Sequence, residues 1–458
     1  MGFLIVLSLL VSNKERGIII KRRTFPKIFF GWWTVLTSGL LSLWGHGYHT
    51  IGFSALFKPI ASELGFSRAV TSVAAGIGRF GGGFEAPVTG LLTDRFGPKV
   101  IVLVGTFLLG LGLILMNFID SLWAFYVIWG IIVGTGVNIA LTLPLDKAIA
   151  NWFVKKRGLA LGIRMTSIGL ATVAVLPLIT WLVSTQGWRM TCVIGGVVMW
   201  LVGLPLIWFL VKQQRPEYYG LLPDGARVQA DLREDTSRMI VVGVEYAAEV
   251  GEVEFTLRQT MRTPAYWLFT VASAGHQMVT SVIFIHVVPF LTDMGVSPMR
   301  AAGIIAIAGA ISLPARFIGG SIADRVKKEH LRFIIGGAYL LQAAAIVAFL
   351  LNQTFTMAYV FLILWWLGHG GGLPVNPALV ARYFGRKSFG SIRGISQMIA
   401  TPFGVIGPIY AGWIYDTEGS YIAAFIVFTA LLVFSATIML FVTSSKPPAQ
   451  VTDVDKIV

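Results

Sequence analysis

The chain has 458 residues, of which 55% are hydrophobic and only 13% charged, and its mean hydropathy is +0.76. Such an apolar composition excludes an ordinary soluble domain and predicts an integral membrane protein. The formal net charge of +14 would suggest nucleic-acid binding in a soluble protein, but in a membrane protein its meaning depends on how it is distributed among the loops.

Stretches of roughly 20 mostly apolar residues, the length that crosses a bilayer as a helix, recur along the chain. Twelve lie within 32–56, 69–92, 99–118, 122–145, 158–183, 189–211, 265–291, 298–322, 332–351, 357–381, 391–415 and 421–443. The sequence therefore predicts an all-α, polytopic membrane protein. Six spans precede the polar segment 212–262 and six follow it, which predicts two six-helix bundles joined by a linker.

Lysine and arginine residues are distributed unevenly among the predicted loops. One set of alternating loops holds only Lys58, Arg68, Arg189 and Arg300, whereas most of the 36 lie in the other loops and in the terminal tails. Positively charged loops stay in the cytoplasm, so both termini are predicted to be cytoplasmic in a multi-pass protein of the cell membrane. The predicted parts are a cytoplasmic tail (1–28), a first bundle (29–211), a cytoplasmic linker (212–262), a second bundle (263–443) and a second cytoplasmic tail (444–458).

Several classes of chemistry find no support in the sequence. The single cysteine, Cys192, allows no intramolecular disulfide and no cysteine-based metal site. Neither a phosphate-binding P-loop nor an HExxH motif is present, so no ATP-driven pump, enzyme, metal or other cofactor is expected. The N-terminal run FLIVLSLLV is about half a span long and precedes its basic cluster, the reverse of a signal peptide. It is either an interfacial segment or a misassigned start.

The two predicted bundles share a repeated loop motif. TGLLTDRFGPK (89–99) follows the second span and GGSIADRVKK (319–328) follows the eighth. The helix dipole favours cations at a helix C-terminus, where these basic residues lie. The charged groups can also hold neighbouring helices together through hydrogen bonds. The residues predicted to control an inward gate are Asp94, Arg95, Lys99, Asp324 and Arg325. Repeated six-helix bundles of this kind occur in secondary transporters, whose substrate site lies near the membrane midplane between the halves.

These motifs carry a resemblance to a known family. GLLTDRFGPK and its copy resemble the loop signature of the major facilitator superfamily, from Gly31 to about Val442. The stretches GWW, FKPIASELGFSRA, RPEYYGLLPDG and HVVPFLTDMG resemble the branch that holds the monocarboxylate transporters and the oxalate/formate antiporters. The resemblance implies the twelve-helix fold of that superfamily and transport of a small organic anion.

Arg316 is the arginine of greatest functional interest in the predicted spans. It lies eight residues, or about 12 Å of helix, from Asp324, too deep to reach the membrane surface comfortably. Burying it costs on the order of 3 kcal/mol, so it should face a partner or a water-filled cavity. The resemblance implies that this arginine binds the substrate carboxylate, which a guanidinium can grip with two hydrogen bonds. The alternative is a salt bridge between helices.

Arg79 and Glu85 lie in the second predicted span. Arg79 is expected either to pair with groups of another helix or to contribute to substrate binding. Glu85 lies one residue from the position that the repeat relates to Arg316, so it is a candidate for proton coupling. Its alternative is an ion pair with Arg79 or Arg164. Arg164 lies about 10 Å of helix from Arg157 and is expected to reach the interface, or else to contact a second anion.

Five histidines lie in or beside the predicted spans, at positions 46, 49, 276, 286 and 369. Histidine titrates near neutral pH and could carry a coupled proton, although a lone histidine among apolar residues is usually a hydrogen-bonded packing group. His49 and His286 are candidates for proton coupling. His46 and His49 share one helix face, which favours this pair among the five. His49 is also a candidate for substrate binding.

Two departures limit the resemblance. The proton-coupled monocarboxylate transporters have an aspartate where this chain has Ser312 and a lysine where it has Ile51. Proton coupling is therefore either relocated, to Glu85 or His49, or absent. The oxalate antiporter has a lysine in its eleventh span, and the stretch after Arg393 offers none, which favours a substrate with one carboxylate.

The sequence as a whole predicts a secondary transporter of a small organic anion, most consistent with a monocarboxylate such as lactate or pyruvate. Its expected partners are that anion, a proton or counter-anion, and the lipid bilayer; the oligomeric state is undetermined. Two alternatives stay open. The first is transport of a sugar or drug with Arg316 in a structural role, and the second is a membrane sensor that binds a ligand without moving it.

Overall fold

The computed structural model describes residues 28–66, 68–228, 235–249 and 251–444, and over these residues the chain is helical, without strands. The all-α prediction is therefore confirmed. The terminal tails predicted from the sequence lie almost wholly outside the described residues.

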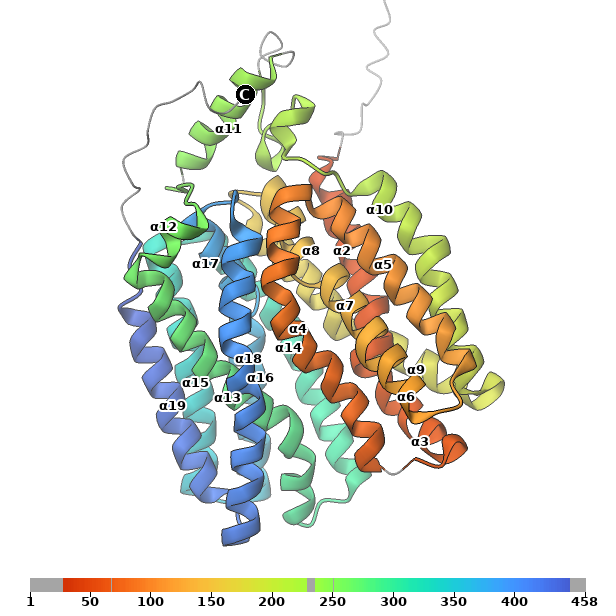
Figure 1. Ribbon diagram of the computed structural model, residues 1–458. Coiled ribbons are helices and arrows are strands. Elements are labelled where there is room, and N and C mark those ends of the chain that lie inside the picture. Colours follow the sequence, from red (N-terminus) through yellow and green to blue (C-terminus); the bar gives the residue numbers. More distant parts are fainter. Residues whose placement is uncertain (1–27, 67, 229–234, 250, 445–458) are drawn as a thin grey trace, which may run out of the picture.

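The helices before residue 212 form one side of the bundle in Figure 1, from red to yellow-green. In chain order they are α2 (Gly31–His46), η2 (Gly47–Ile51), α3 (Phe53–Leu64), α4 (Arg68–Phe96), α5 (Pro98–Leu115), η3 (Met116–Phe118), α6 (Leu122–Phe125), η4 (Tyr126–Val133), α7 (Gly134–Leu141), α8 (Leu143–Trp152), α9 (Arg157–Val198), η5 (Met199–Gly203) and α10 (Leu204–Leu210).

The helices after residue 262 form the other side, from green to blue (Figure 1). They are α13 (Pro264–Asp293), α14 (Pro298–Arg325), η9 (Lys328–His330), α15 (Leu331–Leu351), α16 (Phe355–Gly372), α17 (Val375–Phe384), α18 (Phe389–Glu418) and α19 (Ile422–Leu440). We call the two sides the first and second half. Each half has its own buried apolar core.

The segment 212–262, called the linker, carries η6 (Pro216–Tyr219), η7 (Pro223–Gly225), α11 (Thr236–Ala248) and α12 (Leu257–Met261). Figure 1 shows α11 and α12 together at one end of the bundle. We call this the linker end.

Nine helices among the described residues are long and apolar enough to cross a membrane, against the twelve predicted spans. One of the nine, 157–210, holds two predicted spans. Gly187, with a φ of 79°, separates the two spans within α9. The predicted spans at 32–56 and 69–92 are not among the nine. Their helices α2 and α4 are rich in glycine, serine and threonine, and α4 also carries Arg79 and Glu85, which lowers the hydropathy.

The two halves meet along two helix pairs, α4 with α18 and α9 with α14. Glycine makes both contacts possible: a Cβ atom at Gly90 would lie 2.2 Å from the carbonyl oxygen of Gly390, and one at Gly158 would lie 2.2 Å from that of Gly320. Larger side chains would separate these backbones. The sequence therefore positions α14, with Arg316, directly against the first half.

Candidate functional site

Arg316 lies in the contact between the two halves. Its side chain is only 8% exposed, and its carbonyl oxygen lies 2.9 Å from where a Cβ atom of Gly162 on α9 would be. The Nη1 atom donates a hydrogen bond to the carbonyl oxygen of Met165, also on α9, at 2.6 Å. The predicted burial between helices is therefore observed, and the guanidinium spans the interface between the halves.

The guanidinium of Arg316 is incompletely satisfied. Its Nε atom is buried without a hydrogen-bond partner, and no carboxylate of the described residues lies within 4 Å of it. A salt bridge between helices, the alternative predicted from the sequence, is thus not formed by the described part of the chain. Ser312, one turn away, is fully buried and donates its hydroxyl hydrogen bond to the carbonyl oxygen of Gly309.

Glu85 is held by neutral donors of its own half. The hydroxyl of Thr135 donates to Oε1 at 2.5 Å and the amide of Asn138 donates to Oε2 at 3.3 Å, both from α7. The ion pair with Arg164 that the sequence left open is not formed. The side chain of Arg79, in the same helix α4, lies outside the described residues.

The two histidines proposed for proton coupling occupy different surroundings. His49 lies in η2, half-buried, with its ring stacked on Trp129 at 5.6 Å between centroids. His286 has both ring nitrogens engaged: Nδ1 lies 3.1 Å from the Tyr421 hydroxyl, and Nε2 lies 3.1 Å from the carbonyl oxygen of Pro408. Both ring nitrogens therefore have partners within the second half, as expected of a packing histidine.

Arg164 corrects an expectation from the sequence, since it does not reach the membrane interface. Its side chain is 2% exposed, and it forms an ion pair with Asp146 and donates to the carbonyl oxygen of Leu141. The other oxygen of Asp146 pairs with Arg393 of α18. Asp146 therefore joins the two halves through a carboxylate shared by two arginines, and it leaves Arg164 without the freedom to bind a second anion.

Asp94, from the first copy of the repeated motif, binds the second half. Its carboxylate accepts hydrogen bonds from the backbone of Gly390 at 3.1 Å and of Ser391 at 2.7 Å, in the first turn of α18, and from the Ser391 hydroxyl at 2.5 Å. It also pairs with Lys147 of α8. An anion at a helix N-terminus satisfies free N–H groups and is favoured by the helix dipole.

Asp324, from the second copy, makes the reciprocal contact with the first half. It accepts hydrogen bonds from the backbone of Gly158 at 2.6 Å and of Leu159 at 2.7 Å, in the first turn of α9. Arg382 of α17 lies 3.8 Å from its carboxylate. Each aspartate thus caps a helix of the opposite half, an arrangement that follows the sequence repeat.

The basic residues of the repeated motif do not join the halves among the described contacts. Arg95 and Arg325 are exposed. Lys99 donates to the carbonyl oxygen of Trp208 at 2.6 Å and covers its ring, both within the first half. Of the five predicted gate residues, the two aspartates make the contacts between halves.

The linker adds a buried carboxylate at the same end of the bundle. Glu252 accepts from Arg157 of α9 at 2.9 Å and from Arg386, just before α18, at 3.0 Å, with all three side chains at most 1% exposed. One linker residue therefore connects the start of α9 in the first half with the segment just before α18 in the second half.

Glu254 supports this connection. Burial alone would raise the pKa of its carboxyl, but the charges of Arg215 and Arg386 outweigh burial and hold that pKa below its ordinary value. Glu254 is therefore ionised at neutral pH and stays attached to the second half through the backbone N–H of Lys387 at 2.7 Å.

Close contact between the halves is concentrated toward the linker end. Along α4 it extends from Gly90 to Gly83, whose added Cβ atom would meet Thr401. Farther from the linker end, added Cβ atoms at Gly76, Gly303 and Gly309 would have no neighbour within 4 Å among the described residues. The structure is thus closed at the linker end.

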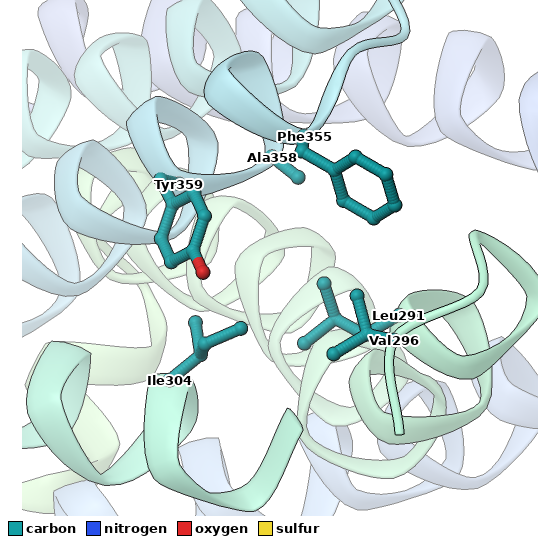
Figure 2. Close-up of a pocket in the computed structure, with 6 residues that line it drawn as sticks. All are labelled: Leu291, Val296, Ile304, Phe355, Ala358 and Tyr359. Atoms are coloured by element: carbon teal, nitrogen blue, oxygen red, sulfur yellow. The ribbon is translucent and has the colours of Figure 1, made fainter. Parts of the chain in front are cut away.

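A small apolar pocket lies elsewhere, within the second half. Figure 2 shows its lining, which comes from α13, α14, α16 and the loop between α13 and α14. The residues are Leu291, Val296, Ile304, Phe355, Ala358 and Tyr359. The lining carries no charged group, so this pocket does not suit an organic anion.

Comparisons with known proteins agree with this architecture. The family model of the Major Facilitator Superfamily matches residues 35–404. The chain belongs to the Major Facilitator Superfamily. It is therefore a multi-pass membrane transporter with twelve helices in two halves, not an enzyme, and its substrate is a small molecule.

Relatives of this transporter include monocarboxylate transporter 13 of Rattus norvegicus, 24% identical over 429 residues, which cover 92% of this chain and 91% of that protein. Monocarboxylate transporter 12 of Mus musculus is 25% identical over 371 residues, covering 79% and 75%. Among solved structures, the proton:xylose symporter XylE has a TM-score of 0.69 at 15% identity, covering 91% of this chain and 97% of that one. The last similarity bears on the fold alone.

Some residues of this site were not singled out from the sequence. Asp146 directly follows the predicted span 122–145, and Arg393 lies near the start of the predicted span 391–415. An aspartate inside the apolar stretch around Leu145 was a usable signal, because buried carboxylates require partners. Its partners come from α9 and α18, and only the tertiary structure identifies them.

Proposed function

We propose that this transporter moves a small monocarboxylate, of the size of lactate or pyruvate, and binds its carboxylate through Arg316. The observation that carries the proposal is a guanidinium 8% exposed between the halves, with an unpartnered Nε atom and no carboxylate among its described neighbours. A buried charge without a counter-charge is costly, and a substrate carboxylate would supply both the charge and the missing acceptor.

Two further observations support a substrate with one carboxylate. Arg164, the other arginine that could have contacted an anion, is already paired with Asp146. Two relatives, which match 92% and 79% of this chain, are named monocarboxylate transporters. His49, Arg79 and Glu85 stay candidates for the cavity in the first half.

We further propose that transport proceeds by alternating access, driven by proton symport or by exchange, with the linker end and both termini in the cytoplasm of a cell-membrane protein. The caps by Asp94 and Asp324 would form the inward gate, closed in this conformation. Opening it would break hydrogen bonds from four backbone N–H groups, which those groups could then form with water. Arg95, Lys99 and Arg325 would contribute positive charge on the cytoplasmic side.

Uptake into proteoliposomes tests this proposal. We would measure labelled lactate, oxalate and formate with and without an inward proton gradient, using the wild type, Arg316→Lys and the control Arg300→Lys. Arg300 is an exposed arginine of the same half. We expect lactate uptake to fall by at least about 100-fold in Arg316→Lys, because a lysine cannot form the bidentate hydrogen bonds of a guanidinium with a carboxylate. Uptake by the control should be unchanged.

Two results would contradict the proposal. If no carboxylate is transported while neutral solutes are, the substrate class is wrong. If Arg316→Lys transports as fast as the wild type, the guanidinium is not the binding group.

A further inference from the structure

Two histidines that are far apart in the sequence meet in the second half, beside the proposed substrate site. The rings of His276 on α13 and His369 on α16 are stacked, with centroids 6.0 Å apart and planes 22° apart. In the sequence, 93 positions separate them. The fold brings them together.

His276 is firmly held. Its Nε2 atom lies 3.1 Å from the side-chain oxygen of Gln342 and 3.3 Å from the Thr280 hydroxyl, and its ring stacks on Tyr339 at 4.3 Å. The Gln342 oxygen can only accept, so Nε2 carries the proton in this arrangement. His276 therefore has a fixed orientation and presents a rigid ring face to His369.

His369 differs from its neighbour in its polar contacts. It is only 9% exposed, and its Nδ1 atom is buried without a hydrogen-bond partner in the described part of the chain. Aromatic rings surround it, with Trp366 and Phe284 each meeting its ring edge to face at 5.8 and 5.6 Å. A buried polar atom without a partner is uncommon and calls for an explanation.

Packing brings His369 to the level of Arg316. Cβ atoms added at Gly370 and Gly319 would lie 2.7 Å from the Ser312 carbonyl oxygen and 2.1 Å from the Gly371 carbonyl oxygen, respectively. The glycines that follow His369 therefore touch α14 on both sides of Arg316.

The titratable groups around His369 come from three helices. His276 of α13 stacks on His369, and Tyr339 of α15 stacks on His276. Arg316 lies on α14, between the residues that the glycines after His369 touch. None of the ion pairs of the described residues includes a carboxylate bound to His276, His369 or Arg316. A proton on His369 would thus add a second positive charge to a site that has no anion of its own.

We propose that His369 is the proton-binding residue that couples proton movement to carboxylate movement. This inference rests on the proposed function. A carboxylate at Arg316 would stabilise the imidazolium form of His369, and the imidazolium would strengthen carboxylate binding by the same amount, because coupling is reciprocal. Proton and anion then bind together and leave together. Glu85, in the other half and already held by Thr135 and Asn138, is the competing candidate.

Binding of labelled lactate to the purified protein at different pH values tests this role. In the wild type we expect affinity to rise on acidification from about pH 8 to pH 6, by up to about tenfold per pH unit, because the anion-bound protein takes up a proton that the free protein does not hold, while lactate stays ionised. In His369→Gln the affinity should not vary with pH and should stay at the weak alkaline value. His330→Gln removes an exposed histidine of the same half and should behave as the wild type.

A second measurement needs no variant. Lactate added to wild-type protein in weakly buffered solution near pH 7 should cause uptake of protons from the medium, approaching about one per bound lactate. This measurement stays informative if His369→Gln does not fold.

The outcomes separate this inference from the proposed function. If the wild type binds no carboxylate at any pH, the proposed function is overturned, and this inference with it. If lactate binds but takes up no proton, or if folded His369→Gln keeps the wild-type pH dependence, only the role of His369 is overturned. Loss of pH dependence in Glu85→Gln with His369→Gln unaffected would assign the proton to the first half.

Discussion

The charged groups at the linker end and those around Arg316 differ in the partners that the chain provides for them. At the linker end, Asp94, Asp324 and Asp146 each bind partners in both halves or in the opposite half, and their contacts include backbone N–H groups and basic side chains. Arg316, by contrast, has no carboxylate within 4 Å among the described residues, and the buried Nδ1 atom of His369 has no hydrogen-bond partner there. Both sets lie between helices, so burial alone does not distinguish them.

This difference in partners distinguishes structural from functional charges in a membrane protein. A buried charge whose partners come from the chain stabilises a particular arrangement of helices. A buried charge without such partners destabilises the protein unless a ligand supplies them. Mutations of the first kind should therefore alter stability or conformation, and mutations of the second kind should alter binding.

The largest effect is expected for Asp146→Ala. This change leaves Arg164 and Arg393 without their shared carboxylate, and stranding a buried charge costs about 3–5 kcal/mol. Thermal unfolding in detergent should show a large fall in melting temperature. Glu249→Ala is the control, because its pair with Lys155 is exposed and should contribute little. Equal melting temperatures for the two variants would show that the Asp146 bridge does not stabilise the fold.

A smaller effect is expected for Asp324→Asn. It weakens the cap on α9 by about 1–2 kcal/mol, which shifts the conformational equilibrium about tenfold toward opening at the linker end. The two states can be followed with a cysteine introduced at Gly309, and the native Cys192 should not interfere because it is buried. In the structure, which is closed at the linker end, Gly309 has open space around it. Under alternating access, opening the linker end should close that space. Labelling of that cysteine by a thiol reagent should slow in Asp324→Asn. The exposed Arg325→Gln should label at the wild-type rate, and a slowing there instead would assign the gate to the arginine.

Much of the fold could be predicted from the sequence, because it depends on local and periodic signals. Apolar spans on both sides of one polar segment and a repeated motif indicated two helical halves, and the depth of Arg316 in its span indicated burial. The individual partners could not be predicted in the same way. Arg164 was expected at the membrane interface because it is only about 10 Å of helix from Arg157. Depth in a span does not reveal that Asp146, on a neighbouring helix, forms an ion pair with it.

The gate residues show the same limit. The repeated motif indicated five charged residues, yet sequence spacing could not tell which of them point toward the opposite half. The aspartates do so because their carboxylates reach the first turns of α9 and α18, whereas Lys99 folds back onto Trp208. Stacking of His276 on His369 likewise depends on the packing of α13 against α16 and has no signature in the sequence.

The most direct test of the central claim is the thermal stability of Arg316→Met, measured with and without lactate. If Arg316 exists to bind substrate, replacing it by an apolar side chain of similar length should cost less than about 1 kcal/mol or should stabilise the ligand-free protein, and lactate should no longer raise the melting temperature. If Arg316 is instead a structural residue, Arg316→Met should lower the melting temperature as much as Asp146→Ala does.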